Sequence, residues 1–196
     1  MRSPKGILLN QRKYALSLIS KVGLSGAKPT SSPLEQNQKL TTVDYWATGD
    51  EELQDICAYQ KLIGKLIYLT ITRPDICFVV QVLSQFMHHP KQSHLEAALR
   101  VVRYIKGCPG RGVLMKRKLV EQVIDYCDSD WAACPNTRRS VTGYVVKMGD
   151  SLISWKSKKQ QTMSRSSADV ENRSMTAVVS EVVWLIGLMT ELEIEV

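Results

Sequence analysis

The sequence lacks the cysteine and histidine patterns that mark disulfide frameworks and zinc sites. Its 196 residues include five scattered cysteines, with no Cys-x-x-Cys pair, and only three histidines. An odd number of scattered cysteines does not indicate a disulfide framework, so we expect a reducing compartment. His88, His89 and His94 have no cysteine at ligand spacing, and we expect them at the surface around the turn at Pro90.

Long uninterrupted apolar runs are also missing. Those present are too short to predict a membrane span, and residues 7–9 are too short for the core of a secretory signal peptide. We therefore expect an intracellular protein, cytoplasmic or nuclear, with no membrane partner and no support for secretion. The N-terminal region has no acidic residue before Glu35, which is weakly compatible with a mitochondrial presequence. Its first basic residues are Arg2, Lys5, Arg12 and Lys13.

What the sequence does have is a core-forming composition and an excess of positive charge. With 44% hydrophobic residues, the chain can bury the core of one large domain or two small ones. The formal net charge of +7 favours an anionic partner, with nucleic acid ahead of a membrane surface. An ordinary solvated basic face has a similar excess, so charge alone leaves both interpretations open.

Residues 1–110 predict a helical unit. Apolar spacing indicates a short helix over residues 12–22, and residues 23–57, rich in Pro, Ser, Thr, Gln and Asn, predict an extended linker. Three further apolar faces at helical spacing lie between residues 58 and 107. Joined by short turns, they predict a compact helical packing unit.

Two local signals place the starts of these helices. Pro74 is suited to a first helical turn after Thr72 or Arg73. Ser93, followed three residues later by Glu96, predicts the N-cap of the next helix in a capping-box arrangement.

After Gly110 the apolar period changes from helical to alternating. Strands are predicted over residues 112–115, 123–126, 143–148 and 152–155. The turn signal Gly149-Asp150 joins the last two as an antiparallel hairpin, and one long helix follows from Ser166. The whole chain therefore predicts an α+β fold, with the helical unit over residues 1–110 and an α/β layer of antiparallel strands plus one long helix over residues 111–196.

Two carboxylates stand where they could serve a metal. Asp128 follows an apolar strand, and Glu171 lies in the first turns of the long helix. Carboxylates from two rigid elements can share a Mg²⁺ ion. A structural interpretation is also open, in which Asp128 caps a turn and Glu171 favours the helix N-terminus through the dipole. Spacing alone favours this second interpretation.

Basic residues gather around the same segment, interleaved with Trp131 and Trp155. They are Arg138, Arg139, Lys156, Lys158, Lys159 and Arg165. Such a pattern is typical of a surface that follows the phosphates of nucleic acid. An exposed hairpin with charged edges would look the same.

Short motifs occur in order along nearly the whole chain. They are YQKLIGKLIYL at 59–69, TRPDI at 72–76, LSQFM at 83–87, RYIKG at 103–107, DSDWA at 128–132, TRRS at 137–140, ISWKSKKQ at 153–160 and SRSSA at 164–168. On these motifs, from about Gly6 to Glu195, the chain resembles the Pol polyproteins of copia-type LTR retrotransposons.

This resemblance implies the thumb-like or connection-like end of a reverse transcriptase over residues 1–110, followed by a truncated ribonuclease H-like domain over 111–196. It implies that Asp128 and Glu171 match two catalytic, Mg²⁺-binding carboxylates of an enzyme that cleaves RNA in RNA–DNA hybrids. A further catalytic aspartate is expected on a strand after Val196, and the polymerase metal motif before Met1.

Departures from the family pattern occur beside Glu171. Asp169, Val170 and Asn172 stand where Glu, Ala and Tyr are usual. Two carboxylates alone would hold Mg²⁺ weakly or not at all, so we expect no hybrid cleavage by this chain on its own. The shortened sheet is also expected to leave an unpaired strand edge and apolar helix surface, which the remainder of a polyprotein would cover.

Two functions stay open. The first is a remnant of a hybrid-cleaving polyprotein that keeps binding to RNA–DNA hybrid or other nucleic acid. The second is a non-enzymatic reused fragment, as in organellar open reading frames or pathogen effector-like proteins. The sequence contains no Arg-x-Leu-Arg motif, which argues against the effector route.

Overall fold

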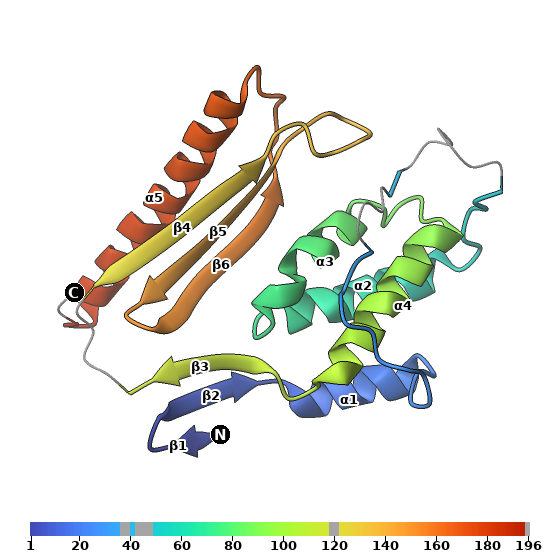
Figure 1. Ribbon diagram of the computed structural model, residues 1–196, viewed down its shortest axis with the longest axis horizontal. Coiled ribbons are helices and arrows are strands. Elements are labelled where there is room, and N and C mark those ends of the chain that lie inside the picture. The colour runs from blue at the N-terminus through green and yellow to red at the C-terminus, as the bar shows by residue number, and fades with distance from the viewer. Residues whose placement is uncertain (36–39, 42–48, 118–121, 195–196) are drawn as a thin grey trace. The chain divides into compact units, whose positions relative to one another are not determined.

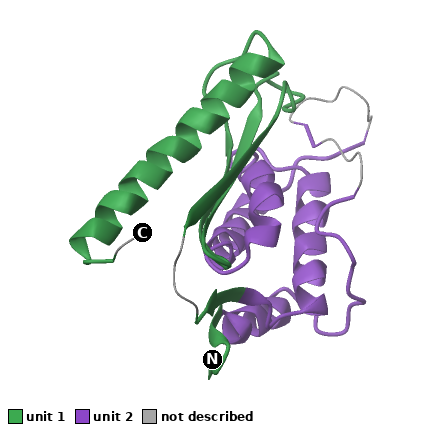
Figure 2. Cartoon of the chain, turned by 60° about the vertical axis from the view of Figure 1, so that its left-hand side comes forward, with its two compact units in different colours: residues 1–9, 113–196 green, residues 10–112 purple. Residues whose placement is uncertain are grey.

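The structure is a computed structural model that describes residues 1–35, 40–41, 49–117 and 122–194. It divides into two compact units, residues 10–112 and residues 1–9 with 113–196, each described here by itself (Figure 2). Both helices and antiparallel sheets are present, which confirms the α+β prediction at the level of fold class.

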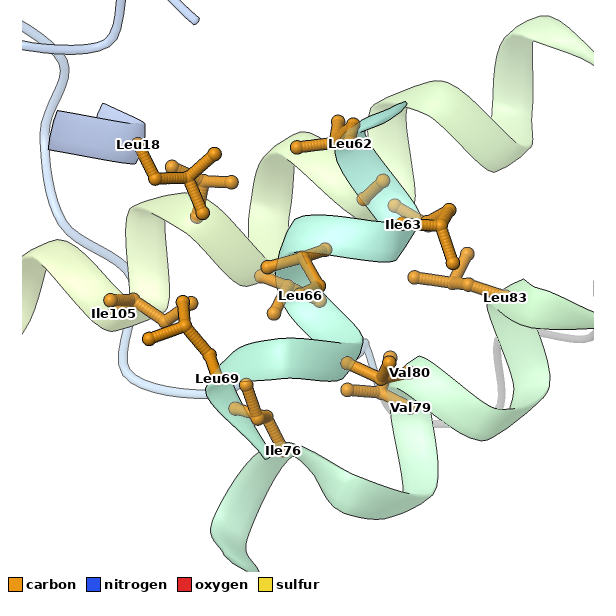
Figure 3. Close-up of a cluster of buried hydrophobic side chains, with 14 of the residues drawn as sticks. Leu18, Leu62, Ile63, Leu66, Leu69, Ile76, Val79, Val80, Leu83 and Ile105 are labelled. Atoms are coloured by element: carbon orange, nitrogen blue, oxygen red, sulfur yellow. The ribbon is translucent and has the colours of Figure 1, made fainter. Parts of the chain in front are cut away.

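The unit over residues 10–112 is helical. Its elements are α1 (Arg12–Lys21), α2 (Ile56–Leu69), a 3₁₀ turn η1 (Pro74–Ile76), α3 (Cys77–Ser84) and α4 (Gln92–Gly107). Their apolar faces meet in one core, as predicted from helical spacing (Figure 3). Leu18, Ile63, Leu66, Leu69, Ile76, Val79, Val80, Leu83 and Ile105 are among its buried side chains. The predicted linker at 23–57 lies partly outside the described residues, and α2 begins within its last two positions.

The start of α4 corrects the sequence prediction. The helix begins at Gln92, so Ser93 lies inside its first turn and is not the N-cap. The backbone N–H of Ser93 donates to Asp50 Oδ1 at 3.0 Å, and its hydroxyl donates to Asp50 Oδ2 at 2.7 Å. A carboxylate from a distant segment thus satisfies this donor of the first turn, which no local capping pattern could reveal.

His94 is a second correction, because it is fully buried instead of lying at the surface. Its Nδ1 accepts the backbone N–H of Lys91 at 3.0 Å, and its ring stacks on Phe86 with centroids 3.9 Å apart. His88 and His89 are exposed, as predicted.

The TRPDI motif forms a partly buried charge cluster around Arg73. Arg73, with a side chain only 3% exposed, donates from Nε and Nη2 to the two oxygens of Asp75, both at 2.8 Å. Tyr104 of α4 donates to Asp75 at 2.9 Å, and Arg111 does so at 3.2 Å. Burial alone would raise the pKa of Asp75, but the hydrogen bonds and charge of Arg73, with the other two donors, hold it below its usual range. The motif therefore ties η1 to the end of α4.

The other unit contains two sheets. In the first, β1 (Arg2–Ser3), β2 (Gly6–Asn10) and β3 (Gly112–Lys116) lie in that order. The pairing of β2 with β3 joins residues 1–9 to the later part of the chain. The observed units therefore differ from the predicted 1–110 and 111–196 segments at residues 1–9 and 111–112, and the domain assignment itself stays a prediction.

The second sheet is antiparallel, in the order β4 (Val123–Asp130), β5 (Val141–Met148) and β6 (Ser151–Lys159) (Figure 1). The predicted hairpin at Gly149-Asp150 is confirmed by the pairing of Met148 with Ser151. The strands run longer than predicted, and the register shifts between Val146 and Lys147.

The helix α5 (Ser167–Glu191) packs along this sheet (Figure 1). Ser166 caps it by accepting the N–H of Asp169 at 3.2 Å. Its buried face joins Tyr144 and Val146 of β5 in a small core. By length and composition α5 could also cross a membrane, which corrects the expectation that every apolar stretch is too short. Core helices pass the same test, and α5 buries one face on the sheet.

Candidate functional site

Asp128 lies in β4, two residues before the strand ends, and pairs with Gly143 of β5. Its carboxylate is exposed and accepts the backbone N–H of Ser129 at 2.8 Å. Asp130 follows two residues later on the same strand face, in an Asp-x-Asp spacing that is a property of the sequence alone.

The two faces of β4 meet different surroundings. Cys127 packs against the core beneath α5, and the Ser129 hydroxyl lies 3.5 Å from the Val170 carbonyl of that helix. Because successive side chains of a strand alternate, Asp128 lies on the opposite face of the sheet.

Glu171 is exposed and is the fifth residue of α5, in its second turn. Its neighbour Val170 contacts Ser129, so the structure brings the backbones beside the two predicted carboxylates together. The Asp128 side chain nevertheless lies on the face of β4 opposite to the one that α5 covers. Among the described residues, no group of three or more His, Cys, Asp or Glu side chains could hold a metal ion. The role of Asp128 and Glu171 as catalytic and metal residues stays a prediction.

The basic residues divide into two groups. The first group lies in the two connections that flank the β5–β6 hairpin: Arg138 and Arg139 between β4 and β5, and Arg165 between β6 and α5. A hydrogen bond joins these two connections, because Trp131 Nε1 donates to the Ser164 carbonyl at 3.3 Å. The first connection is a closed turn, in which the backbone N–H of Cys134 donates to the Arg139 carbonyl at 3.0 Å.

Lys159 belongs to this first group. Its Nζ lies 3.7 Å from the buried Cys134 thiol. Burial alone would raise the pKa of Cys134, but hydrogen bonds from the segment Asn136–Thr137 and the Lys159 charge lower it.

Lys156 and Lys158 form the second group, on the face of β6 that α5 covers. Ser154, two residues earlier on that face, donates its hydroxyl to Glu181 of α5 at 2.7 Å. The two lysines line a groove of about 520 Å³ whose other wall includes Arg173, Ala177 and Glu181. The sequence did not predict Arg173 and Glu181 as groove residues. Their spacing of eight residues places them on one face of the helix, which is the signal that the sequence offered.

Comparison with known proteins finds relatives along almost the whole chain. The "Retrovirus-related Pol polyprotein from transposon RE1" of Arabidopsis thaliana is 40% identical over 193 residues, which are 98% of this chain and 13% of that protein. An uncharacterized mitochondrial protein of Arabidopsis thaliana is 37% identical over 92% of this chain and 73% of its own length.

A third relative is "Secreted RxLR effector protein 161" of Plasmopara viticola, 38% identical over 65% of this chain and 90% of its own length. The chain thus spans only about an eighth of the polyproteins that it matches. No family model and no solved structure matches it.

Proposed function

Because the chain belongs to the copia-type retrotransposon Pol family, we propose that residues 113–196 are the first part of a ribonuclease H-like domain that binds nucleic acid. One observation carries the proposal. The antiparallel sheet β4-β5-β6 is followed directly by α5, with Asp128 in the first strand and Glu171 near the start of the helix. That is the element order the resemblance implies.

The partner we propose is an RNA–DNA hybrid or a related nucleic acid. Arg138, Arg139 and Arg165 have no recorded ion pair within the part of the chain that the structure describes. The hydrogen bond between Trp131 and Ser164 supports placing them at one end of the sheet, beside Lys159. Unpaired cations gathered in this way can neutralise phosphates and release counterions.

Cleavage is a separate question. Asp128 and Glu171 would have to hold Mg²⁺, which requires near-octahedral oxygen coordination. They fit that ion poorly here, because Asp128 lies on the sheet face opposite to the one that α5 covers. We therefore propose binding without metal-dependent cleavage by this chain, and cleavage only together with the remainder of a polyprotein. Such a remainder could pair with β4, which pairs only with β5 within the described residues. The proposed location is intracellular.

The test combines a gel shift with a cleavage assay on a labelled RNA–DNA hybrid. We expect salt-sensitive binding that the triple variant Arg138→Glu, Arg139→Glu and Arg165→Glu weakens at least tenfold. The slope of log affinity against log salt should fall by about 2.7 if all three contact phosphates. Lys61→Glu, on the exposed surface of α2, is the charge-reversal control and should change affinity less than twofold.

Two results would contradict the proposal. Hybrid binding that is absent at low salt, or indifferent to the triple variant, would remove the nucleic-acid function. Cleavage with Mg²⁺ or Mn²⁺ that disappears in Asp128→Asn would show a working metal site and overturn binding without cleavage.

A second candidate is a non-enzymatic interaction protein. It is favoured by the apolar side chains that α5 exposes, among them Val179, Val183 and Trp184, which are between 56% and 64% exposed. The relative named as a secreted effector agrees with this candidate. Absence of hybrid binding, together with concentration-dependent association that Val183→Lys abolishes, would favour it.

A further inference from the structure

The groove between β6 and α5 is lined by none of the three arginines Arg138, Arg139 and Arg165. Its volume of about 520 Å³ is in the range of small-molecule sites, roughly 300–1,000 Å³. Four cationic side chains and one carboxylate line it. All of its lining residues belong to one compact unit.

Lys156 and Lys158 carry the positive charges of the groove that an anionic ligand can reach. Both are exposed, and neither has a recorded ion pair among the residues that the structure describes. They alternate onto the same strand face, about 7 Å apart along β6. Arg173 is less available, because Nε and Nη2 donate to Asp169 at 2.9 and 3.1 Å. The lysines are therefore the side chains that an incoming anion would meet.

The charge of the side chains that line the groove changes sign along its length. Arg173 and Glu181 are eight residues apart on α5, which is about 12 Å along the helix axis. Ser154 donates to Glu181 at 2.7 Å at one end of the groove. Strand pairing places Lys156 beside Tyr144, close to this carboxylate, and Lys158 beside Thr142, two residues nearer the N-terminal end of α5, where Gln160 donates to the Val170 carbonyl.

The anionic end also has a fixed partner. Tyr144, which is 8% exposed, hydrogen-bonds Glu181, and burial together with the Glu181 charge raises the pKa of Tyr144 to about 12. The phenol thus stays protonated at neutral pH. A ligand that fills the groove needs an anionic group at one end and hydrogen-bond donors at the other.

We propose that this groove binds a nucleoside monophosphate, either free or as the phosphorylated end of a nucleic-acid strand. The phosphate lies at Lys156 and Lys158, and the sugar hydroxyls or base amino group donate to Glu181. Glu181 accepts from Ser154 and Tyr144 and keeps further acceptor capacity, which a phosphate alone would not use, whereas a nucleoside alone would leave the lysines unmatched. This inference goes beyond hybrid binding, because none of the three arginines lines the groove.

The test is isothermal titration of the whole chain at low salt with adenosine 5′-monophosphate, adenosine and inorganic phosphate. We expect the nucleotide to bind at least tenfold tighter than either part. Lys156→Glu and Lys158→Glu should each weaken nucleotide binding at least tenfold, whereas Lys61→Glu should stay within twofold. Glu181→Gln should bring the nucleotide affinity close to that of inorganic phosphate.

A 5′-phosphorylated oligonucleotide separates the two sources of the ligand. Competition with the free nucleotide that requires the 5′-phosphate supports a strand end, and no competition supports the free nucleotide. The inference is overturned if the nucleotide does not bind, if Lys158→Glu leaves binding unchanged, or if inorganic phosphate binds equally well.

The outcome is distinguishable from that of the proposed function. Hybrid binding without nucleotide binding would overturn only the groove assignment. Nucleotide binding without a hybrid gel shift would overturn only the hybrid proposal.

Discussion

At the scale of single residues, His94 is the side chain whose environment departs furthest from expectation. Its Nδ1 accepts the Lys91 N–H, so Nε2 carries the hydrogen and donates to the Thr41 carbonyl at 3.2 Å. A proton on Nδ1 would break the first of these bonds. Burial lowers the pKa of His94; the Thr41 hydrogen bond and the Asp50 charge oppose this shift, and the Lys91 charge adds to it. The neutral ring is therefore the folded form.

A pH-dependent stability follows from this lowered pKa. The unfolded histidine titrates near its ordinary 6.5, so the full stability is present above that pH. As pH falls below 6.5 the unfolded state gains a proton first, and the free energy of unfolding decreases by up to about 1.36 kcal/mol per pH unit until the folded pKa is reached.

The measurement is urea unfolding between about pH 8 and pH 5. We expect His94→Gln to lose this part of the pH dependence. Exposed His88→Gln should keep it, and equal pH profiles for wild type and His94→Gln would contradict the assignment.

Also at the residue scale, the sequence placed Asp128 and Glu171 on the correct elements but not on facing surfaces. Strand membership follows from local apolar runs. A helix packs on the sheet face whose side chains form the core. In β4 that face carries Cys127 and Ser129, and Asp128 lies on the other face. A shift of one residue in that choice would reverse the arrangement.

At the scale of elements, α2, α3, the β5–β6 hairpin and α5 could be predicted because each has a local pattern of apolar spacing and turn residues. The small sheet β1-β2-β3 could not, because β1 has two residues and its partners are far apart in sequence. Gly6 is its critical position. Its φ is +143°, and an added Cβ would lie 2.1 Å from the Met115 carbonyl oxygen.

We therefore expect Gly6→Ala to disrupt the pairing of β2 with β3. The substitution should lower the free energy of unfolding by about 2 kcal/mol, through backbone strain and the close contact. Hydrogen exchange should speed up at the amide of Arg117, which donates to the Lys5 carbonyl at 3.1 Å.

Gly26→Ala is the matched control for this element, because an added Cβ there meets nothing within 4 Å. Its exchange rates and unfolding midpoint should stay near those of the wild type. Unchanged exchange at Arg117 in Gly6→Ala would mean that β2 and β3 do not pair in solution.

At the scale of the whole molecule, the chain has two compact units with separate cores. The helical core draws on all the helices between residues 12 and 107 and includes the fully buried Tyr59, whose hydroxyl donates to the Leu83 carbonyl at 2.8 Å. A unit with its own core can fold alone.

The corresponding prediction concerns a fragment of residues 10–112. We expect it to be helical by circular dichroism and to unfold in urea in one cooperative transition. A gradual loss of helicity without a transition would contradict its independence. Tyr59→Ala should abolish the transition, whereas Tyr68→Ala, at a 51% exposed position, should keep it.

The sequence by itself determined the family, the fold class and most helices and strands, because ordered motifs and apolar periodicity are local properties of the chain. Only the tertiary structure decided which surfaces face one another. It buried His94, supplied Asp50 to the start of α4, paired residues 1–9 with β3 and placed Lys156 and Lys158 opposite Glu181. Each of these depends on contacts between distant segments, which packing of the whole core selects and no local pattern encodes.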